Sequence, residues 1–175
     1  ICGPKSRELL ASLTDDNIDN ASLPYMRMKP IKVCGVEARV FRISFTGELS
    51  FEINVPARYG KFIWDKVIES GKQYKITPYG TEAMHVLRAE KGFIIVGQDT
   101  DGSATPSDLN MDWIVSKKKE DFLGKRSFIR SDTARNDRKH LVGLLINDKK
   151  TVVPEGSHIV DEASKRPPMK MSGHI

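Results

Sequence analysis

An alternation of apolar and polar residues on both sides of Gly35 constrains the fold of this chain more than any other feature. Every second residue from Val36 to Val40 is apolar, and β-branched residues are frequent in the flanking segments. Such a pattern is typical of half-buried strands. It predicts an antiparallel hairpin that joins residues 29–34 to residues 36–44, with Gly35 in the turn.

Further elements follow from the same kind of pattern. A third strand is expected over residues 51–55, and amphipathic helices are expected over 5–13, 57–70 and 78–91, the last of them stopped by Gly92. Strands and helices that mix without strict alternation indicate an α+β class, an antiparallel sheet with packed helices. Additional strand-like runs are the apolar segment 93–96, residues 113–116 and residues 139–147.

The highly charged segment 131–138 is the best candidate for a domain boundary. We therefore expect an α+β domain over residues 1–133, and the beginning of a C-terminal all-β domain, a β-barrel, over residues 134–175. Both ends of the sequence fall inside expected elements. This suggests a piece of a longer protein that lacks the N-terminal part of the first domain and the end of the second.

Charge and motif content favour some classes of function over others. The chain has 28 Lys and Arg against 23 Asp and Glu, but no aromatic residues alternate with the basic clusters, so solvated surfaces are favoured over nucleic-acid binding. The four histidines show no metal-ligand spacing. Neither a signal peptide nor a membrane-spanning apolar run is visible, which favours a cytoplasmic protein without a membrane partner.

Two residues, Glu52 and Arg88, are candidates for chemistry. Glu52 lies on the face of its predicted strand opposite the apolar side chains, where a solvent-facing role is the simpler explanation. Arg88 lies near the end of a predicted helix, where it could serve the helix dipole or pair with Glu52 or Glu90. The pattern alone leaves both roles undecided.

Several segments resemble the folate-binding aminomethyltransferase family, to which the glycine-cleavage T-protein belongs. Four motifs occur in the family's order over about residues 1–146. They are Ile43–Pro56 around Thr46-Gly47-Glu48, Pro78–Ala83 with Leu87–Gly92, Gly97–Asp101 with Thr105-Pro106, and Asp121–Lys125. The resemblance implies that the first domain is the central part of the aminomethyltransferase folate-binding fold.

The resemblance also implies a ligand and a set of contacts. The family binds tetrahydrofolate, its strand glutamate matches Glu52 and contacts the pterin, and its helix arginine matches Arg88. Phe45 and Asp99 are further candidates for the lining of this site. The family's catalytic aspartate belongs to an N-terminal part that this chain lacks, so we expect no catalytic residue here and an inactive isolated fragment.

Within the family, residues 44–50 and 97–102 are most similar to the sarcosine oxidase alpha subunits. This resemblance implies a heterotetrameric enzyme in which a flavin-bearing beta subunit oxidises sarcosine. It also implies that the folate site captures the one-carbon unit as 5,10-methylenetetrahydrofolate. Smaller subunits would be additional partners, and flavin and NAD would bind elsewhere in the complex. A T-protein-type aminomethyltransferase, a dimethylglycine dehydrogenase and a non-catalytic folate-fold accessory module remain alternatives.

Overall fold

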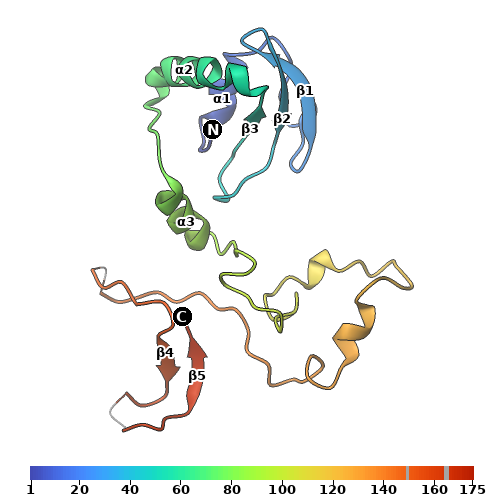
Figure 1. Cartoon of the computed structure of the whole chain (residues 1–175), viewed down its shortest axis with the longest axis vertical. Helices are drawn as coiled ribbons and strands as arrows, with labels where there is room; N and C mark the ends of the chain where they lie inside the picture. Colours follow the sequence, from blue (N-terminus) through green and yellow to red (C-terminus); the bar gives the residue numbers. More distant parts are fainter. Residues whose placement is uncertain (149, 164–165) are drawn as a thin grey trace. The chain divides into compact units, whose positions relative to one another are not determined.

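The computed structural model describes residues 1–148, 150–163 and 166–175. They form two compact units, Ile1–Ile95 and Val96–Ile175, which are described separately below (Figure 1). Small antiparallel sheets and a few helices make up the chain, so its mixed α/β character agrees with the sequence. The domain boundary between residues 133 and 134 and the all-β character of the second domain stay predictions.

The first unit contains the predicted hairpin, extended by the third strand. Strands β1 (Met28–Val33), β2 (Val36–Phe41) and β3 (Glu52–Asn54) form an antiparallel sheet in chain order. The turn between β1 and β2 consists of Cys34 and Gly35, whose φ angles are 50° and 77°. Two-residue hairpin turns with positive φ at both positions match the right-handed twist of the strands, which explains the glycine.

We expect Gly35→Ala to destabilise the first unit by about 1–2 kcal/mol, because a Cβ is unfavourable in the left-handed region. No atom lies within 4 Å of the position that this Cβ would occupy, so the cost is one of backbone conformation alone. Gly60→Ala is the matched control, because its Cβ also meets open space but φ is −55°. That variant should gain about 0.4–1 kcal/mol. Urea unfolding of both variants tests the difference, and equal stabilities would contradict it.

The core of the first unit lies between the sheet and two helices, α1 (Ser6–Ala11) and α2 (Gly60–Gly71). Figure 1 shows both helices on one side of the sheet. The turns η1 (Ala57–Tyr59) and η2 (Lys72–Tyr74) flank α2. Buried apolar residues of the core are Leu9, Leu10, Leu13, Ile18, Leu23, Ile31, Val33, Ala38, Val40, Phe51, Ile63 and Val67. The predicted helix over 57–70 is thus confirmed, although Phe62 remains 42% exposed.

Helix α3 (Thr81–Glu90) ends where the sequence places its stop. Gly92 has a φ of 70°, its N–H donates to Ala89 O at 2.9 Å, and the N–H of Phe93 donates to Arg88 O at 2.9 Å. This pair of bonds is a Schellman motif, which satisfies the last carbonyls of the helix. Of the ten residues of α3, only Arg88 is buried. Apolar packing therefore contributes little to holding this helix in place.

The second unit has short elements: the 3-10 turns η3 (Asp112–Ile114) and η4 (Lys125–Ile129), and strands β4 (His158–Val160) and β5 (Met171–His174). The two strands pair antiparallel. A buried carboxylate, Asp108, organises the preceding loop, because Arg138 donates to both of its oxygens at 2.8 and 2.6 Å. The main chain of Asp108 also accepts a hydrogen bond from Leu141 N at 2.7 Å.

Three strand predictions for apolar runs are wrong. Residues 93–96 form no strand, and Val96 is 83% exposed, because the chain turns at Gly97 with a φ of 93°. Residues 111–115 close i→i+3 hydrogen bonds instead, and Trp113 is 78% exposed. Within residues 139–147, which the structure describes completely, no regular strand forms. In each case an apolar run has no neighbouring strand with which to pair.

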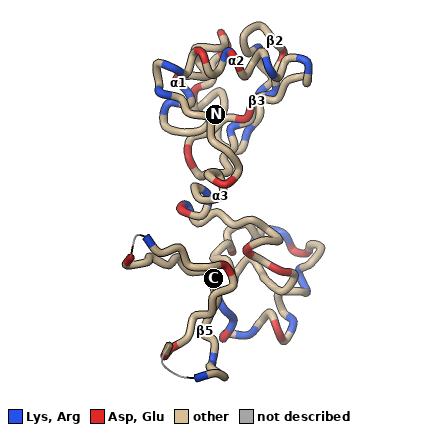
Figure 2. Tube along the Cα trace, turned by 60° about the vertical axis from the view of Figure 1, so that its left-hand side comes forward, with Lys and Arg blue, Asp and Glu red and all other residues tan. Residues whose placement is uncertain are grey.

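Charged side chains are distributed over both units. Figure 2 shows Lys and Arg interspersed with Asp and Glu along the chain. In the part of the chain that the structure describes, no helix is long and apolar enough to cross a membrane.

Candidate functional site

The connection between β2 and β3, residues 42–51, is called here the 42–51 loop. Residues at the start of the chain hold it firmly. Leu49 O accepts hydrogen bonds from Gly3 N at 2.8 Å and from Ser6 Oγ at 2.9 Å. Cys2 Sγ and Thr46 Oγ1 share a hydrogen bond of 2.9 Å, and Thr46 is only 2% exposed. Because these bonds involve both backbone and side chains, the loop has a defined conformation even though it lacks regular structure.

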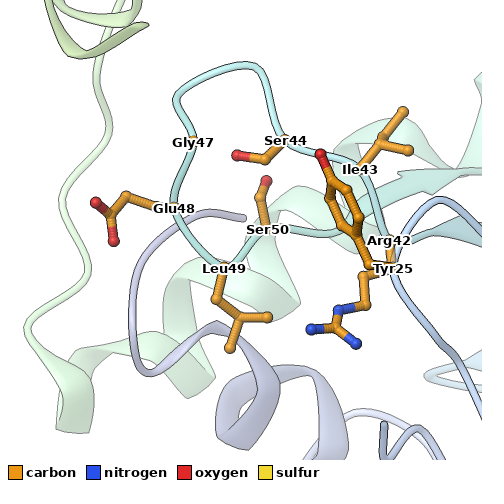
Figure 3. A pocket seen from close by; sticks show the side chains of 8 residues that line it. All are labelled: Tyr25, Arg42, Ile43, Ser44, Gly47, Glu48, Leu49 and Ser50. Carbon is orange, nitrogen blue, oxygen red and sulfur yellow. The ribbon is translucent and has the colours of Figure 1, made fainter. Parts of the chain in front are cut away.

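A hollow of about 250 Å³ lies against this loop (Figure 3). Its lining consists of Tyr25, Arg42, Ile43, Ser44, Gly47, Glu48, Leu49 and Ser50. Figure 3 shows the side chains of Ser44 and Ser50 turned toward each other, with the carboxylate of Glu48 turned away from them. The polar atoms Ser44 Oγ and Arg42 Nε are buried and have no hydrogen-bond partner among the described residues. Buried polar groups are normally satisfied, so a water molecule or a polar ligand fits this hollow.

Asn20 holds the guanidinium of Arg42 by a hydrogen bond. Its Oδ1 accepts a hydrogen bond from Arg42 Nη1 at 2.9 Å and another from Arg7 Nη2 at 2.8 Å. Burial, and secondly the charge of Arg42, lower the pKa of Arg7. Two cations, Arg7 and Arg42, thus share one neutral acceptor, and Arg42 also lines the hollow.

The 42–51 loop also contacts helix α3 and Lys91, the C-cap residue of that helix. The ring of Phe45 lies 6.3 Å from the ring of His85, measured between centroids. Lys91 Nζ pairs with Glu48 Oε1 at 3.1 Å. A Cβ added to Gly47 would lie 2.6 Å from Lys91 Cγ, so the lysine stem packs directly on this glycine. These contacts bring the loop to the helix that carries Arg88.

The start of α3 lies near the same cluster. Burial, and secondly a hydrogen bond with Cys2, raise the pKa of the Tyr79 phenol. Cys2 thus lies near both the loop, through its bond with Thr46, and Tyr79, two residues before α3.

The predicted site residues have different surroundings. Glu52 is exposed on β3, in register with Phe41, as the alternating pattern predicts. Phe45 is 42% exposed and Arg88 9%, and Arg88 Nη1 donates to Phe93 O at 3.1 Å. Asp99 is exposed and belongs to the second unit, so its place beside the others stays a prediction. All four lie outside the lining of the hollow, although Phe45 falls between two lining residues.

Sequence reasoning overlooked the other partners of the loop. Arg42 and Ser44 supply the unsatisfied buried atoms, and His85 and Lys91 supply the contacts from the helix side. Glu48 belongs to the motif around Thr46-Gly47-Glu48. A glycine beside a charged residue was the signal in the sequence that another side chain could pack closely against this turn. Among the described residues, no cluster of three or more potential metal ligands occurs.

Comparisons with known proteins give the family. The GCVT N-terminal domain matches residues 1–119. The chain is 52% identical over 162 residues, 91% of its length, to sarcosine oxidase subunit alpha of Corynebacterium sp. strain U-96. It is 40% identical over 162 residues, 91% of its length, to the subunit of that name from Rhizobium meliloti strain 1021. An aminomethyltransferase of Caldanaerobacter subterraneus subsp. tengcongensis is 35% identical over 144 residues, 82% of the chain.

The chain spans 17% of the Corynebacterium subunit, 16% of the Rhizobium subunit and 38% of the aminomethyltransferase. The matched region includes the 42–51 loop, β3 and α3, together with the hollow. Since this match covers more than half of its residues, the chain belongs to the GCVT N-terminal domain family.

Proposed function

We propose that this chain is the folate-binding segment of a sarcosine oxidase alpha subunit, where the one-carbon unit of oxidised sarcosine becomes 5,10-methylenetetrahydrofolate. The observation that carries the proposal is the 52% identity to such a subunit over 162 residues that include the 42–51 loop and α3. The exposed position of Glu52 supports it as well, because a carboxylate that faces outward is free to accept a ligand.

The proposed role of Glu52 follows from its chemistry. An ionised carboxylate has two oxygens and accepts two parallel N–H donors at once. A pterin edge presents such a pair, in its amino group and the adjacent ring N–H. Glu52 follows a loop whose backbone is held by hydrogen bonds, so the position of its Cα depends little on the ligand. In this proposal the carboxylate orients the flat ring.

Phe45 and Arg88 complete the proposed contacts. The ring of Phe45 is partly exposed and offers an apolar face to a flat heterocycle. The guanidinium of Arg88 is planar and cationic, which suits either a folate carboxylate or stacking on a ring. Bound tetrahydrofolate would supply the nucleophilic amine. The residues of this chain would bind it, orient it and limit the access of water.

The wider assignment rests on the relatives. We propose a flavin-bearing beta subunit and smaller subunits as partners, with flavin and NAD bound elsewhere in the complex, and a cytoplasmic location. We also retain the proposal that residues 1–133 belong to the folate-binding domain, and that an all-β domain begins at residue 134.

Calorimetry of the full-length protein with tetrahydrofolate tests the proposed function. We expect saturable binding with one site per alpha subunit, and production of methylenetetrahydrofolate when sarcosine is oxidised in its presence. A control titration uses caffeine, a flat heterocycle that carries neither an amino group nor a ring N–H, and it should give no heat of binding. Absence of tetrahydrofolate binding would refute the proposal and favour a non-catalytic accessory module.

The 35% identical aminomethyltransferase favours a second candidate, a T-protein-type reaction. The two candidates differ in the source of the one-carbon unit. Turnover with sarcosine and a flavin-bearing subunit supports the first. Turnover that requires an aminomethyl group on a lipoyl carrier protein, without oxidation of sarcosine, supports the second.

A further inference from the structure

Helix α3 lacks the usual means of attachment to the rest of its unit. Its buried residues comprise Arg88 alone, and apolar positions such as Val86 remain 59% exposed. A helix of ten residues is marginal without tertiary packing. If Arg88 is to face the same ligand as Glu52, specific contacts must hold the C-terminal end of α3 against the 42–51 loop.

Lys91 provides such contacts at the right place. It is the C-cap residue of α3, one position before the Schellman glycine and three after Arg88. Its ammonium pairs with Glu48 at 3.1 Å, and both side chains are about half exposed, at 48% and 40%. An isolated pair with this exposure would contribute little, since solvent screens it.

The stem of Lys91 adds the specificity that the ion pair lacks. Gly47 has a φ of 77°, and a Cβ there would lie 2.6 Å from Lys91 Cγ and 2.9 Å from Lys91 Cβ. The lysine stem therefore occupies space that exists only because residue 47 is glycine. Stem packing and charge pairing together fix both ends of one side chain on two successive loop residues.

We propose that Lys91 is a positioning residue for the folate site. By joining Gly47 and Glu48 to the end of α3, it sets the position of Phe45 and Glu52 relative to Arg88. His85, one helical turn before Arg88, adds a second contact through the ring of Phe45. This inference rests on the proposed function, because the effect of Lys91 is expressed as affinity for tetrahydrofolate.

The test compares variants of the full-length protein by tetrahydrofolate calorimetry and thermal unfolding. Lys91→Ala removes both the stem and the charge of the lysine, and we expect about tenfold weaker binding of tetrahydrofolate. A tenfold change corresponds to about 1.4 kcal/mol, which lies within the range of coupling energies between protein residues that touch each other. Lys91→Met keeps a stem, and we expect about threefold weaker binding. Lys61→Ala is the control, since Lys61 forms an exposed pair with Asp65 on α2 and should bind as the wild type does.

A double-mutant cycle, combined with thermal unfolding, distinguishes a positioning role of Lys91 from a purely structural one. Glu48→Gln and Lys91→Met each remove the ion pair, so the double variant should bind no more weakly than either single one, with an unfolding midpoint close to that of Lys61→Ala. Wild-type affinity in Lys91→Ala, or additive losses in the double variant, would overturn the inference while the proposed function stands. A wild-type protein that does not bind tetrahydrofolate would overturn both.

Discussion

Glu52→Gln in the full-length protein is expected to weaken tetrahydrofolate binding by about 2–5 kcal/mol, the usual effect of disrupting a desolvated charge-assisted pair. The amide keeps the size of the carboxylate, but it replaces one of two acceptors by a donor that would face a donor of the pterin. Sarcosine oxidation by the flavin should remain nearly unchanged, because the proposed function assigns that step to another subunit. Calorimetry and oxygen consumption measure the two effects separately.

Glu37→Gln supplies the control for this experiment. Glu37 is exposed on β2, on the same side of the sheet as Phe41, the residue in register with Glu52. Among the described residues, its ion-pair partner is the exposed Lys32, at 3.6 Å. Its replacement should leave folate affinity unchanged. If Glu52→Gln also binds as the wild type does, Glu52 is a solvent-facing strand residue without a role in binding.

Asp108→Asn is expected to cause the largest single loss of stability in the second unit. Arg138 donates to both oxygens of this carboxylate, and the N–H and hydroxyl of Thr105 donate to Oδ2 at 2.7 and 2.8 Å. Hydrogen bonds to charged groups contribute more than neutral ones, and we expect a loss of about 2 kcal/mol. Removing one partner of a fully buried ion pair costs about 3–5 kcal/mol of stability. The Arg138–Asp108 pair is partly exposed to solvent, so we expect a smaller loss.

The same group should make the second unit sensitive to acid. Hydrogen bonds from Arg138 are the main cause that holds the pKa of Asp108 well below its usual range. The folded state therefore keeps the carboxylate ionised at pH values where the unfolded chain protonates it. Its stabilising contribution is complete above the unfolded pKa of about 4 and decreases as the pH falls below that value. The asparagine variant should lose this part of the pH dependence.

Hydrogen exchange of the Leu141 amide, which donates to Asp108 O, reports on both effects. Asp137→Asn is the matched control, because Arg135 forms a pair of nearly equal geometry with Asp137, at 2.8 and 2.6 Å, on a surface that is 59% and 71% exposed. That variant should exchange as the wild type does. Equal exchange in Asp108→Asn would show that the pair does not stabilise this loop.

The sequence was informative where the order of residues itself determines the structure. Val36, Ala38 and Val40 alternate, and two residues at the turn leave a single register for the hairpin. Gly92 ends α3 because the Schellman bonds are local to its last turn. The run 93–96 misled because an apolar stretch forms a strand only beside another strand. No local pattern reports such a neighbour.

The candidate site was predictable only in part, for a similar reason. The alternation places Glu52 on the polar face of β3, and the structure agrees. The contact of Lys91 with Gly47 and Glu48 joins residues more than forty positions apart in the chain. Spacing rules for helices and strands do not describe pairs of that kind. Only the folded chain shows that one lysine contacts both residues of the turn.

The order of β1, β2 and β3 along the chain has a consequence for biosynthesis. Each strand pairs with its neighbour in sequence, and every buried apolar residue of the core cluster lies between Leu9 and Val67. Contacts between residues near in sequence favour rapid folding, and domains generally fold as they leave the ribosome. The nascent chain can therefore complete this core before α3 has left the ribosome. The loop would then present a finished surface on which the emerging helix docks.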